Sequence, residues 1–504
     1  MRATTEQPYL KNMPKKYDVI IIGAGIGGLT AGAILARNGK KVLVLEKNHM
    51  VGGYTVNFKR KGFEFDASLH MMQGCNKSGI SHNILKKCGI EKKVKFIKPK
   101  ILYHSIYPDF EIKFDQTRTK SFISNLKKFF PQEKKGIDLL LKDVKQALLG
   151  FEEFQIKRKI SSKMKFSFLT RTCEEIYKQY INSPRLITIL SQLWPYFGLP
   201  PAKLSAYYLP FLLYDYHFNG GYYPEGGSGA IADSLRDVIV KNKSDILLNK
   251  KVDKIITNNK KAVGVILKDG EQILGDNIVS NIDARTTFLK MIGTGVFSKS
   301  FVNNLNSLEP SISAFQVYLG LDINISKLGM LDYTIFVNPS FDLSSQFNSI
   351  VKNDIKKSPF VITGYSNLEN NVKANHGKIV LATLAGYDYW KNLSKDAYSK
   401  EKISHGNYLI KKAEKYIPKL RSYVKVMEIA TPLTMERYSG SYKGAIYGWE
   451  NNRHQCGGKR YFLKTPIENL YLAGAWTYPG GGVSGALYSG DMVSGYILSN
   501  TGKK

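Results

Sequence analysis

One glycine-rich turn constrains the fold of this chain more than any other feature. Residues 17–22 form an apolar run that leads into the turn GAGIGG at 23–28, and an apolar helical pattern follows. In this context Gly23 permits a tight turn, Gly25 lets a pyrophosphate approach the backbone, and Gly28 lets the helix pack closely on the strand. The segment therefore predicts a strand, a dinucleotide-binding turn and a helix of a doubly wound parallel sheet.

A single acidic residue narrows the choice of nucleotide. Glu46 ends the next apolar strand, 23 residues after Gly23. An acid at about this offset holds a ribose hydroxyl in dinucleotide-binding folds, and it favours a ribose without a 2′-phosphate. FAD and NAD both satisfy the pattern. The N–H groups at the start of the helix are expected to receive the pyrophosphate.

Two further glycine-rich elements favour FAD over NAD. Residues 47–55 (KNHMVGGYT) place a Gly-Gly pair in a short loop directly after Glu46, and residues 469–486 (NLYLAGAWTYPGGGVSGA) run from a strand through a glycine-rich turn into a helix. A loop of the first kind is typical of flavin-dependent two-domain oxidoreductases and is missing from nicotinamide dehydrogenases. The second element supplies another helix N-terminus for a polar cofactor edge. We therefore expect one bound FAD.

These three elements resemble those of the phytoene desaturase, carotenoid isomerase and retinol saturase family of FAD-dependent oxidoreductases. The resemblance extends to Gly62–Asp66 with His70, to residues 220–227 (GGYYPEGG), to Val252–Ile256 and to residues 281–285 (NIDAR). It is strong in the flavin-binding segments and weak in the middle of the chain. It implies that the backbone of Val252–Ile256 holds the adenine and that His70 lies near the flavin.

The resemblance implies an α/β fold with a Rossmann-type FAD-binding domain, as in glutathione-reductase-like two-domain flavoproteins, and a second α+β substrate domain. Residues 1–75, 219–290 and 436–504 are expected to form the FAD-binding domain. Residues 76–218 and 291–435 are expected to form the substrate domain, the first part mainly helical and the second with a mixed sheet.

The motifs and the resemblance together give the candidate site residues. The candidate cofactor-binding residues are Gly23, Gly25, Ile26, Gly27, Gly28, Glu46, Lys47, Gly52, Gly53, Tyr54, Thr55, Val252, Gly474, Ala475, Pro479, Gly480, Gly481, Gly482 and Val483. His70 is the candidate catalytic residue, and an ordinary hydrogen-bonded histidine there stays an open alternative. Two positions depart from the family: Ala475 stands where many members have Asp, and Tyr54 where some related flavin enzymes have Arg. Backbone N–H groups are expected to replace those contacts.

The resemblance implies an oxidoreductase that acts on C=C bonds of a hydrophobic polyene, carotenoid-like or retinoid-like, by desaturation, saturation or cis–trans isomerisation. A flavin amine oxidase and a non-catalytic, FAD-containing lipid-binding protein are the alternatives. The aromatic stretch Leu193–Tyr214 suits either an apolar tunnel wall or a packed helical core. Because only one dinucleotide fingerprint is present, a separate NAD(P)H domain is not expected. The electron partner and the reaction direction stay open.

The chain is strongly basic, with 73 Lys and Arg against 41 Asp and Glu and a formal net charge of +32. A field of that size favours an anionic partner, and the lysine-rich segments Leu126–Lys145 and Phe151–Lys165 suit contact with anionic lipid. A biased amino-acid composition is the competing explanation, and the two stay open. No nucleic-acid-binding module is recognised, so nucleic acid is not an expected partner.

Cysteine usage and the N-terminal sequence bear on location. The four cysteines are widely spaced and form no CxxC pair, so neither a metal site nor a disulfide framework is expected. The first 16 residues lack an apolar core, which argues against a signal peptide. The glycines within the apolar residues 17–36 favour the strand, turn and helix over a membrane span. We expect a cytoplasmic protein, with peripheral membrane association as the open question.

Overall fold

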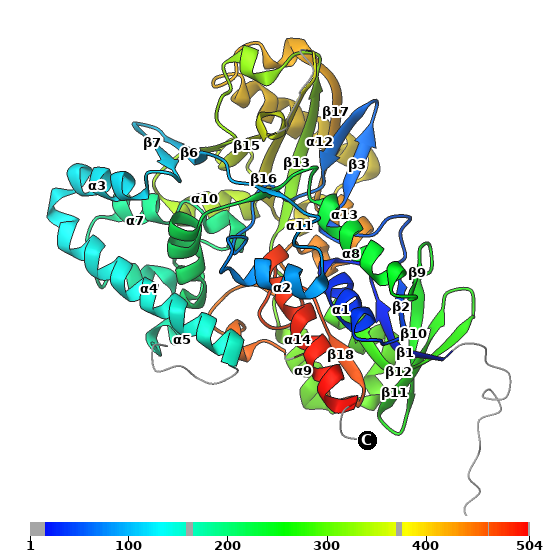
Figure 1. Cartoon of the computed structure of the whole chain (residues 1–504). Helices are drawn as coiled ribbons and strands as arrows, with labels where there is room; N and C mark the ends of the chain where they lie inside the picture. Colours follow the sequence, from blue (N-terminus) through cyan, green and yellow to red (C-terminus); the bar gives the residue numbers. More distant parts are fainter. Residues whose placement is uncertain (1–15, 158–164, 369–374, 462, 502–504) are drawn as a thin grey trace, which may run out of the picture.

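Two large sheets organise the molecule. The computed structural model describes residues 16–157, 165–368, 375–461 and 463–501. In Figure 1 the sheet that contains β1 lies at the lower right, and the sheet that contains β13 lies at the top. Each has seven strands.

The first sheet has the strand order β10-β11-β12-β1-β2-β9, with β18 beside β12. Its strands are β1 (Lys16–Ile22), β2 (Val42–Leu45), β9 (Asp245–Leu247), β10 (Val252–Asn258), β11 (Lys261–Leu267), β12 (Gln272–Ser280) and β18 (Leu470–Leu472). β1 pairs in parallel with β2 and β12, while β10, β11 and β12 form an antiparallel meander. Every residue of β2 is buried, as its unbroken apolar sequence predicts for a strand covered on both faces. The expected Rossmann-type sheet is confirmed.

Helix α1 (Ile26–Arg37) follows the glycine turn and packs between α14 (Val483–Thr501) and α8 (Gly229–Lys241). The crossing of α1 and α14 is close: a Cβ on Gly490 would lie 2.4 Å from the carbonyl oxygen of Gly27. Glycine is therefore required where the first and last helices of the sheet meet. Helix α2 (Ile80–Cys88) packs against the same pair.

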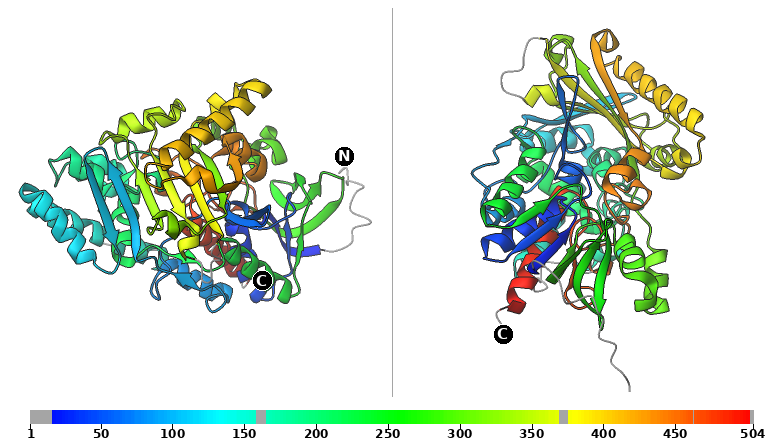
Figure 2. Two further views of the ribbon diagram at one scale, coloured as in Figure 1. Left: turned by 90° about the horizontal axis from the view of Figure 1, so that it is seen from above. Right: turned by 90° about the vertical axis from the view of Figure 1, so that its right-hand side faces the viewer.

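The second sheet has the order β17-β13-β16-β15-β14-β6-β7. Its strands are β6 (Ile101–Tyr107), β7 (Phe110–Asp115), β13 (Ser313–Leu321), β14 (Thr334–Val337), β15 (Phe360–Gly364), β16 (Gly377–Ala385) and β17 (Val424–Ala430). The expectation of a mixed sheet within residues 291–435 is wrong, because the printed strand pairs formed by those residues alone are antiparallel. The sheet is mixed because β14 also pairs in parallel with β6, which comes from the first part of the expected substrate domain. Helices cover one face of this sheet. Phe315, Val317 and Leu319 pack with Trp390 and Leu409, from the helices α11 (Tyr387–Lys391) and α12 (Lys395–Ala413), which lie over the sheet in Figure 2.

The expectation that residues 76–218 are mainly helical is wrong at the hairpin of β6 and β7, which adds two strands to the second sheet. The sequence FEIKFD alternates with the period of a strand: Ile112 and Phe114 are buried, while Glu111 and Lys113 are exposed. This alternation is the signal that predicts the hairpin.

The rest of this portion of the chain is mainly helical, and its helix α3 packs against β7. Its helices are α3 (Thr119–Phe129), α4 (Lys134–Lys157), α5 (Ser167–Thr170), α6 (Cys173–Tyr177) and α7 (Pro184–Leu190). The lysine-rich segment Phe151–Lys165 lies partly outside the described residues. The aromatic stretch that follows forms short turns and the π-helix η6 (Pro210–Asn219). Trp194 and Leu212 of this stretch belong to the packed core.

The remaining helices connect the two sheets or flank the second: α9 (Lys299–Ser307), α10 (Leu343–Val351) and α13 (Pro432–Ser439). The strands of the first sheet come from the three segments expected to form the FAD-binding domain. The domain boundaries themselves stay a prediction. Within the described ranges, no helix combines the length and the apolar character needed to cross a bilayer. Attraction to an anionic membrane surface also stays a prediction.

Candidate functional site

Four parallel strands of the first sheet end at the same level. Ile22 of β1 pairs with Leu45 of β2 and with Ser280 of β12, and Ser280 pairs with Leu472 of β18. The residues that follow these strand ends therefore share one edge of the sheet, which is where ligands bind in open α/β sheets. Segments more than 400 residues apart in sequence meet there.

Glu46 closes the glycine turn from the side of β2. One carboxylate oxygen accepts a hydrogen bond from the backbone N–H of Ala24 at 2.8 Å, and the other accepts from the backbone N–H of Asn48 at 2.9 Å. The N–H of Gly23 donates to the carbonyl of Leu45 at 2.8 Å. The carboxylate is buried and fixed beside the turn, in the position expected for a group that binds a ribose.

Asn281, which sequence reasoning did not select as a site residue, lies at the centre of the converging strand ends. Its side-chain amide donates to the carbonyl of Gly23 at 3.1 Å. A Cβ on Gly25 would lie 2.8 Å from Asn281 Nδ2, and one on Gly474 would lie 2.6 Å from Asn281 Oδ1. A Cβ on Gly27 would lie 2.7 Å from the backbone nitrogen of Gly474. The glycines of two separate motifs are thus needed because a single asparagine occupies the space between them.

The second glycine motif packs directly on the first. The N–H of Gly52 donates to the carbonyl of Ala24 at 2.8 Å, and Gly52 has a φ of 118° that favours glycine. The hydroxyl of Tyr54 lies 3.3 Å from both the hydroxyl of Ser439 and the carbonyl of Ala445. Burial raises the pKa of Tyr54 to about 12, so this side chain is neutral at physiological pH. Tyr54 connects the Gly-Gly loop to the last residue of α13 and to the segment after it through neutral hydrogen bonds. An arginine at this position would bring a charge instead.

Asp66 joins two segments that are far apart in the sequence, Gly62–Asp66 and residues 220–227. Its carboxylate accepts hydrogen bonds from the hydroxyl of Tyr223 and from the backbone N–H of Ser228, the latter at 2.6 Å. Burial raises the pKa of Asp66. This carboxylate anchors the start of α8 to the hairpin of β3 (Asn57–Arg60) and β4 (Phe63–Asp66).

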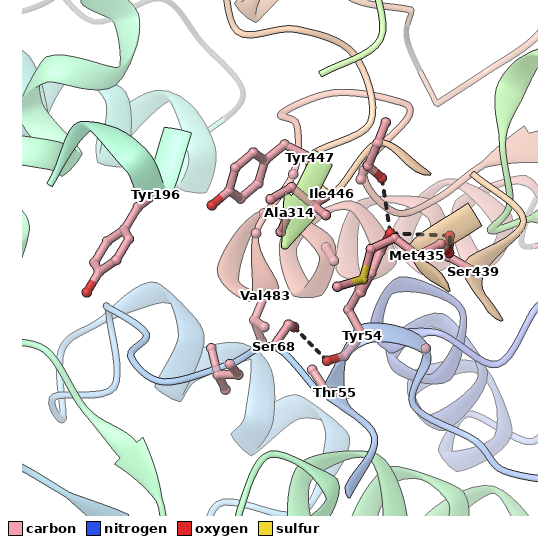
Figure 3. A pocket seen from close by; sticks show the side chains of 18 of the residues that line it. Tyr54, Thr55, Ser68, Tyr196, Ala314, Met435, Ser439, Ile446, Tyr447 and Val483 are labelled. Atoms are coloured by element: carbon pink, nitrogen blue, oxygen red, sulfur yellow. Dashed lines mark hydrogen bonds between the residues drawn. The ribbon is translucent and has the colours of Figure 1, made fainter. Parts of the chain in front are cut away.

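A cavity of about 380 Å³ extends from the strand ends of the first sheet to the second sheet. Figure 3 shows Tyr196 and Tyr447 on one side of it and Thr55 and Ser68 on another. Fourteen of the nineteen candidate cofactor-binding residues line this cavity: Gly23, Gly25, Ile26, Gly27, Glu46, Gly52, Gly53, Tyr54, Thr55, Gly474, Ala475, Gly481, Gly482 and Val483. His70 also lines it. Their roles toward a cofactor stay a prediction.

Two of the five other candidates support the site from outside the cavity. A Cβ on Gly28 would lie 2.5 Å from the carbonyl oxygen of Gly23, so this glycine permits the close packing of turn and helix. Lys47 turns away toward α13, where its ammonium donates to the carbonyl of Arg437 at 3.1 Å.

The remaining three candidates lie apart from the cavity wall. Val252 is buried in the core of the first sheet, two residues after Lys250, whose N–H donates to the carbonyl of Glu46 at 2.8 Å. Pro479 lines a second cavity of about 580 Å³ beside η6. A Cβ on Gly480 would lie 3.0 Å from the hydroxyl of Tyr208.

His70 is placed at the junction of the two sheets by two tyrosines. Its Nε2 lies 2.8 Å from the hydroxyl of Tyr196, and its carbonyl accepts a hydrogen bond from Tyr333 at 2.6 Å. Burial lowers the pKa of His70 to about 4, so the ring is neutral at physiological pH. A neutral, hydrogen-bonded ring is consistent with two roles. It can hold Tyr196 in place in the cavity wall, or it can make a polar contact with a bound molecule.

Ala475, the second departure from the family, is fixed through its backbone. Its carbonyl accepts a hydrogen bond from the guanidinium of Arg460 at 2.9 Å. The same buried guanidinium donates to the carbonyl of Trp449 at 3.0 Å and to the side-chain oxygen of Asn451 at 2.8 Å. Arg460 lies in no recognisable motif, so only the structure identifies it as the residue that holds this turn.

Charge is confined to one end of the cavity. Of the described residues that line it, only Glu46 and Asp283 have ionisable carboxylates, and none is a lysine or arginine. Asp283 follows β12 and accepts hydrogen bonds from the N–H groups of Thr286 at 2.9 Å and Tyr442 at 2.8 Å. The cavity wall on the second sheet carries uncharged side chains.

The strand-end edge fits a dinucleotide on its own geometry. The N–H of Leu29 is the first to bond within α1, so the N–H groups before it have no intrahelical acceptor. Glycines at 25 and 27 place no side chain of their own over those groups, and the amide of Asn281 lies beside both. A carboxylate for a ribose stands beside them. This combination of donors, dipole and space is the one that binds a pyrophosphate.

Comparison with known proteins agrees with this geometry. The family of flavin-containing amine oxidoreductases matches residues 26–498, almost the whole chain. The inactive all-trans-retinol 13,14-reductase of Danio rerio is 26% identical over 545 residues, covering 98% of this chain and 87% of the relative. The chloroplastic prolycopene isomerase of Daucus carota is 27% identical over 507 residues, covering 97% and 81%. The resemblance inferred from the motifs is confirmed.

Solved structures show the same fold. The cyclohexylamine oxidase of Brevibacterium oxydans superposes with a TM-score of 0.61 at 16% identity, covering 97% of this chain and all of the other. The family match and this fold identify a flavin as the class of cofactor.

Proposed function

The chain belongs to the family of flavin-containing amine oxidoreductases, and we propose that it is an FAD-dependent oxidoreductase acting on C=C bonds of a hydrophobic polyene, the class of compound named for its retinol reductase and prolycopene isomerase relatives. Desaturation, saturation and cis–trans isomerisation are the reactions within this proposal. FAD is the flavin that the proposal requires, because the strand-end edge offers a pyrophosphate site together with a carboxylate for a ribose.

One observation carries the proposal: the cavity has no charged side chain, among the described residues, along its wall on the second sheet. An ammonium substrate held there would lose its hydration without gaining a counter-charge, which costs several kcal/mol. An apolar polyene has no such desolvation cost, and its burial against Phe336, Val361 and Leu384 is favoured by the hydrophobic effect.

The residues of this chain divide into two roles under the proposal. The residues around Gly25, Glu46 and Gly52 hold the dinucleotide, and bound FAD supplies hydride chemistry. Tyr196, Tyr447 and neighbouring aromatic rings would exclude water from the part of the cavity next to the second sheet. His70 is neutral and hydrogen-bonded to Tyr196, so it adds a polar ring to that wall but no charge.

Two other functions are favoured by particular findings. Amine oxidation is the activity named for the cyclohexylamine oxidase that shares the fold. A non-catalytic, flavin-containing lipid-binding protein is favoured by the name of the Danio rerio relative, which is called inactive. Both alternatives predict a bound flavin, so cofactor content does not separate them from the proposal.

The test is turnover by the purified, flavin-loaded protein. One anaerobic sample contains oxidised flavin and a second contains photoreduced flavin. All-trans-retinol or a carotenoid is added to each while the visible absorption of the flavin is recorded. The products are identified by mass spectrometry. We expect a polyene changed in double-bond number or geometry. Peroxide formed in air with cyclohexylamine would support the amine oxidase instead. A flavin that binds but changes neither class of compound would support the lipid-binding protein.

A further inference from the structure

The exposed side of α4 carries basic and apolar residues in a single stripe. Lys135, Leu139, Lys142, Lys145 and Leu149 are all exposed, and they follow one another at spacings of three or four residues. This spacing places them on one side of the helix. The stripe is about 21 Å long, because each helical residue adds about 1.5 Å. The opposite side of α4 packs into the core, and the helix lies along the left-hand edge of Figure 1.

All three phenylalanines that are exposed in the described part of the chain lie near this stripe. Phe129 at the end of α3 is 59% exposed, Phe166 directly before α5 is 75% exposed, and Phe218 of η6 is 37% exposed. Phe218 lines the second cavity together with Lys145 and Leu149 of the stripe. Leaving a large aromatic side chain in water forgoes the free energy of its burial, so a cluster of exposed rings indicates a surface that is covered by a partner.

Two ion pairs hold the flanking segments against α4. Lys127 of α3 pairs with Asp138, and Lys165 pairs with Asp143. Lys127 lies two residues before the exposed phenylalanine of α3, and Lys165 directly precedes Phe166. Both aspartates beside the stripe are thus neutralised by a lysine. The three lysines of the stripe itself form no ion pair with any residue that the structure describes, so this surface is positively charged.

A second long helix shows what a lysine-rich composition produces without such a cluster. Helix α12 lies at the top of Figure 1, away from α4. It exposes Lys395, Lys400 and Lys411, and Ile403 is the one large hydrophobic residue exposed among its residues, all of which the structure describes. Excess lysine therefore accounts for the charge of α12. It does not account for the exposed leucines and phenylalanines around α4.

The second cavity opens on the same surface. It has a volume of about 580 Å³, and three of the residues that line it, Lys145, Leu149 and Phe218, are exposed. Its carboxylate on α4 is that of Glu152, whose pKa is raised by burial, which favours the neutral form. The residues that line both this cavity and the first are Gln73, Phe197, Gly481, Ser484 and Gly485. The mouth of the second cavity is therefore rimmed by apolar side chains and one lysine.

The stripe and the three phenylalanines together form one basic and apolar surface, which we call the α4 face. We infer that the α4 face docks the protein on a bilayer that contains anionic lipid. The lysines are attracted to the negative head groups, and the leucines and phenylalanines enter the boundary between head groups and acyl chains. A second copy of the chain is disfavoured as the occupant, because lysines would then face lysines. Docking would place the mouth of the second cavity against lipid rather than water.

The depth of a side chain in the bilayer tests the inference directly. The four tryptophans of the chain are all buried, so an exposed indole reports its own surroundings. Phe166→Trp introduces one on the α4 face, and Ile403→Trp introduces one on α12 as the control. Each flavin-loaded variant is mixed with vesicles of phosphatidylcholine and phosphatidylglycerol in equal amounts, with or without brominated acyl chains. We expect bromine to quench the added fluorescence of Phe166→Trp and not that of Ile403→Trp.

Charge reversal at two places separates docking by the α4 face from attraction by the net charge of the chain. The double variant Lys142→Glu with Lys145→Glu changes the α4 face, and Lys395→Glu with Lys400→Glu changes the net charge equally on α12. We expect the first to lower the partition coefficient onto the same vesicles at least about 20-fold, since each lysine near an anionic surface contributes a factor of about five. The second should lower it much less. Cosedimentation with the vesicles measures both.

Three results would overturn the inference. Equal loss of binding in the two double variants would show that net charge alone attracts the lipid. Equal quenching of Phe166→Trp and Ile403→Trp would show that no particular face meets the bilayer. Failure of the unmodified protein to bind these vesicles would leave an acidic protein as the partner of the α4 face. None of these results bears on the polyene proposal, which is tested by turnover. Circular dichroism and flavin content confirm that each variant is folded.

Discussion

The two ends of the cavity are built by different means. At the end proposed for the cofactor, backbone groups line the cavity, and glycines at 25, 27 and 474 are required because backbone and side-chain atoms lie within 3 Å of any added Cβ. At the end proposed for the substrate, the surface consists of side chains on a sheet, such as Phe336, Val361 and Leu384. Backbone recognition leaves almost no freedom of sequence, whereas a side-chain floor of suitable volume can be assembled in many ways. The family's motifs therefore lie at one end only.

The largest effect is expected from Gly27→Ala. A Cβ at this position would lie 2.7 Å from both the backbone nitrogen of Gly474 and the side-chain oxygen of Asn281, and the backbone cannot yield without displacing a second motif. We expect flavin affinity to fall by at least about 100-fold. The measurement is the flavin absorbance per protein after saturation with FAD and desalting.

The control for this substitution lies in the same part of the fold. Gly495 of α14 has no heavy atom within 4 Å of an added Cβ, so Gly495→Ala should retain its flavin. If Gly27→Ala bound FAD as tightly as Gly495→Ala does, the distinction between a fixed and a permissive end of the cavity would be wrong.

A smaller effect is expected from a buried carboxylate beside the second cavity. Asp215 of η6 lines the second cavity and receives one side-chain hydrogen bond, from Asn219 at 2.6 Å, whereas Glu46 is held by backbone N–H groups. Burial raises the pKa of Asp215 from 3.8 to about 7. The folded state therefore keeps a proton that the unfolded state releases, and stability falls as pH rises from about 4 to 7.

Asp215→Asn removes this titration. At about pH 8 the variant is expected to be more stable than the unmodified protein by up to about 4 kcal/mol, and near pH 4 the two should be equally stable. Urea unfolding at both pH values measures the difference. A variant less stable than the parent at the higher pH would show that the carboxylate has a stabilising partner in the folded protein.

The smallest effect concerns His70, at the junction of the two ends. Because burial lowers its pKa from 6.5 to about 4, its ring should stay neutral between about pH 5.5 and 8.5. The test is an NMR titration of the histidine ring protons, with His70→Gln to assign the signal. A midpoint near the ordinary histidine value would mean that water reaches the ring, and that the junction is open rather than dry.

The difference between backbone contacts at one end of the cavity and side-chain contacts at the other also explains which residues can be selected from the sequence. Glu46, Gly52 and Gly474 could be selected from the sequence because each stands in a short motif with a fixed physical purpose. Asn281 could not be separated from its neighbours, since its role depends on glycines more than 190 residues away on either side. Arg460 carries no motif at all. The hairpin of β6 and β7 is predictable from its alternation, although the segment around it has a mainly helical pattern.

Local sequence patterns are enough to specify the parallel sheet, its dinucleotide turn and the acidic residue beside it, because those features need particular residue types at particular spacings. Three other features depend on the folded chain: how the second sheet crosses the cavity, which amide side chains face the cavity, and the lack of charge on the described residues of its wall there. Strand pairing between distant segments sets these relations, and pairing depends on the packing of the whole chain and not on any short pattern.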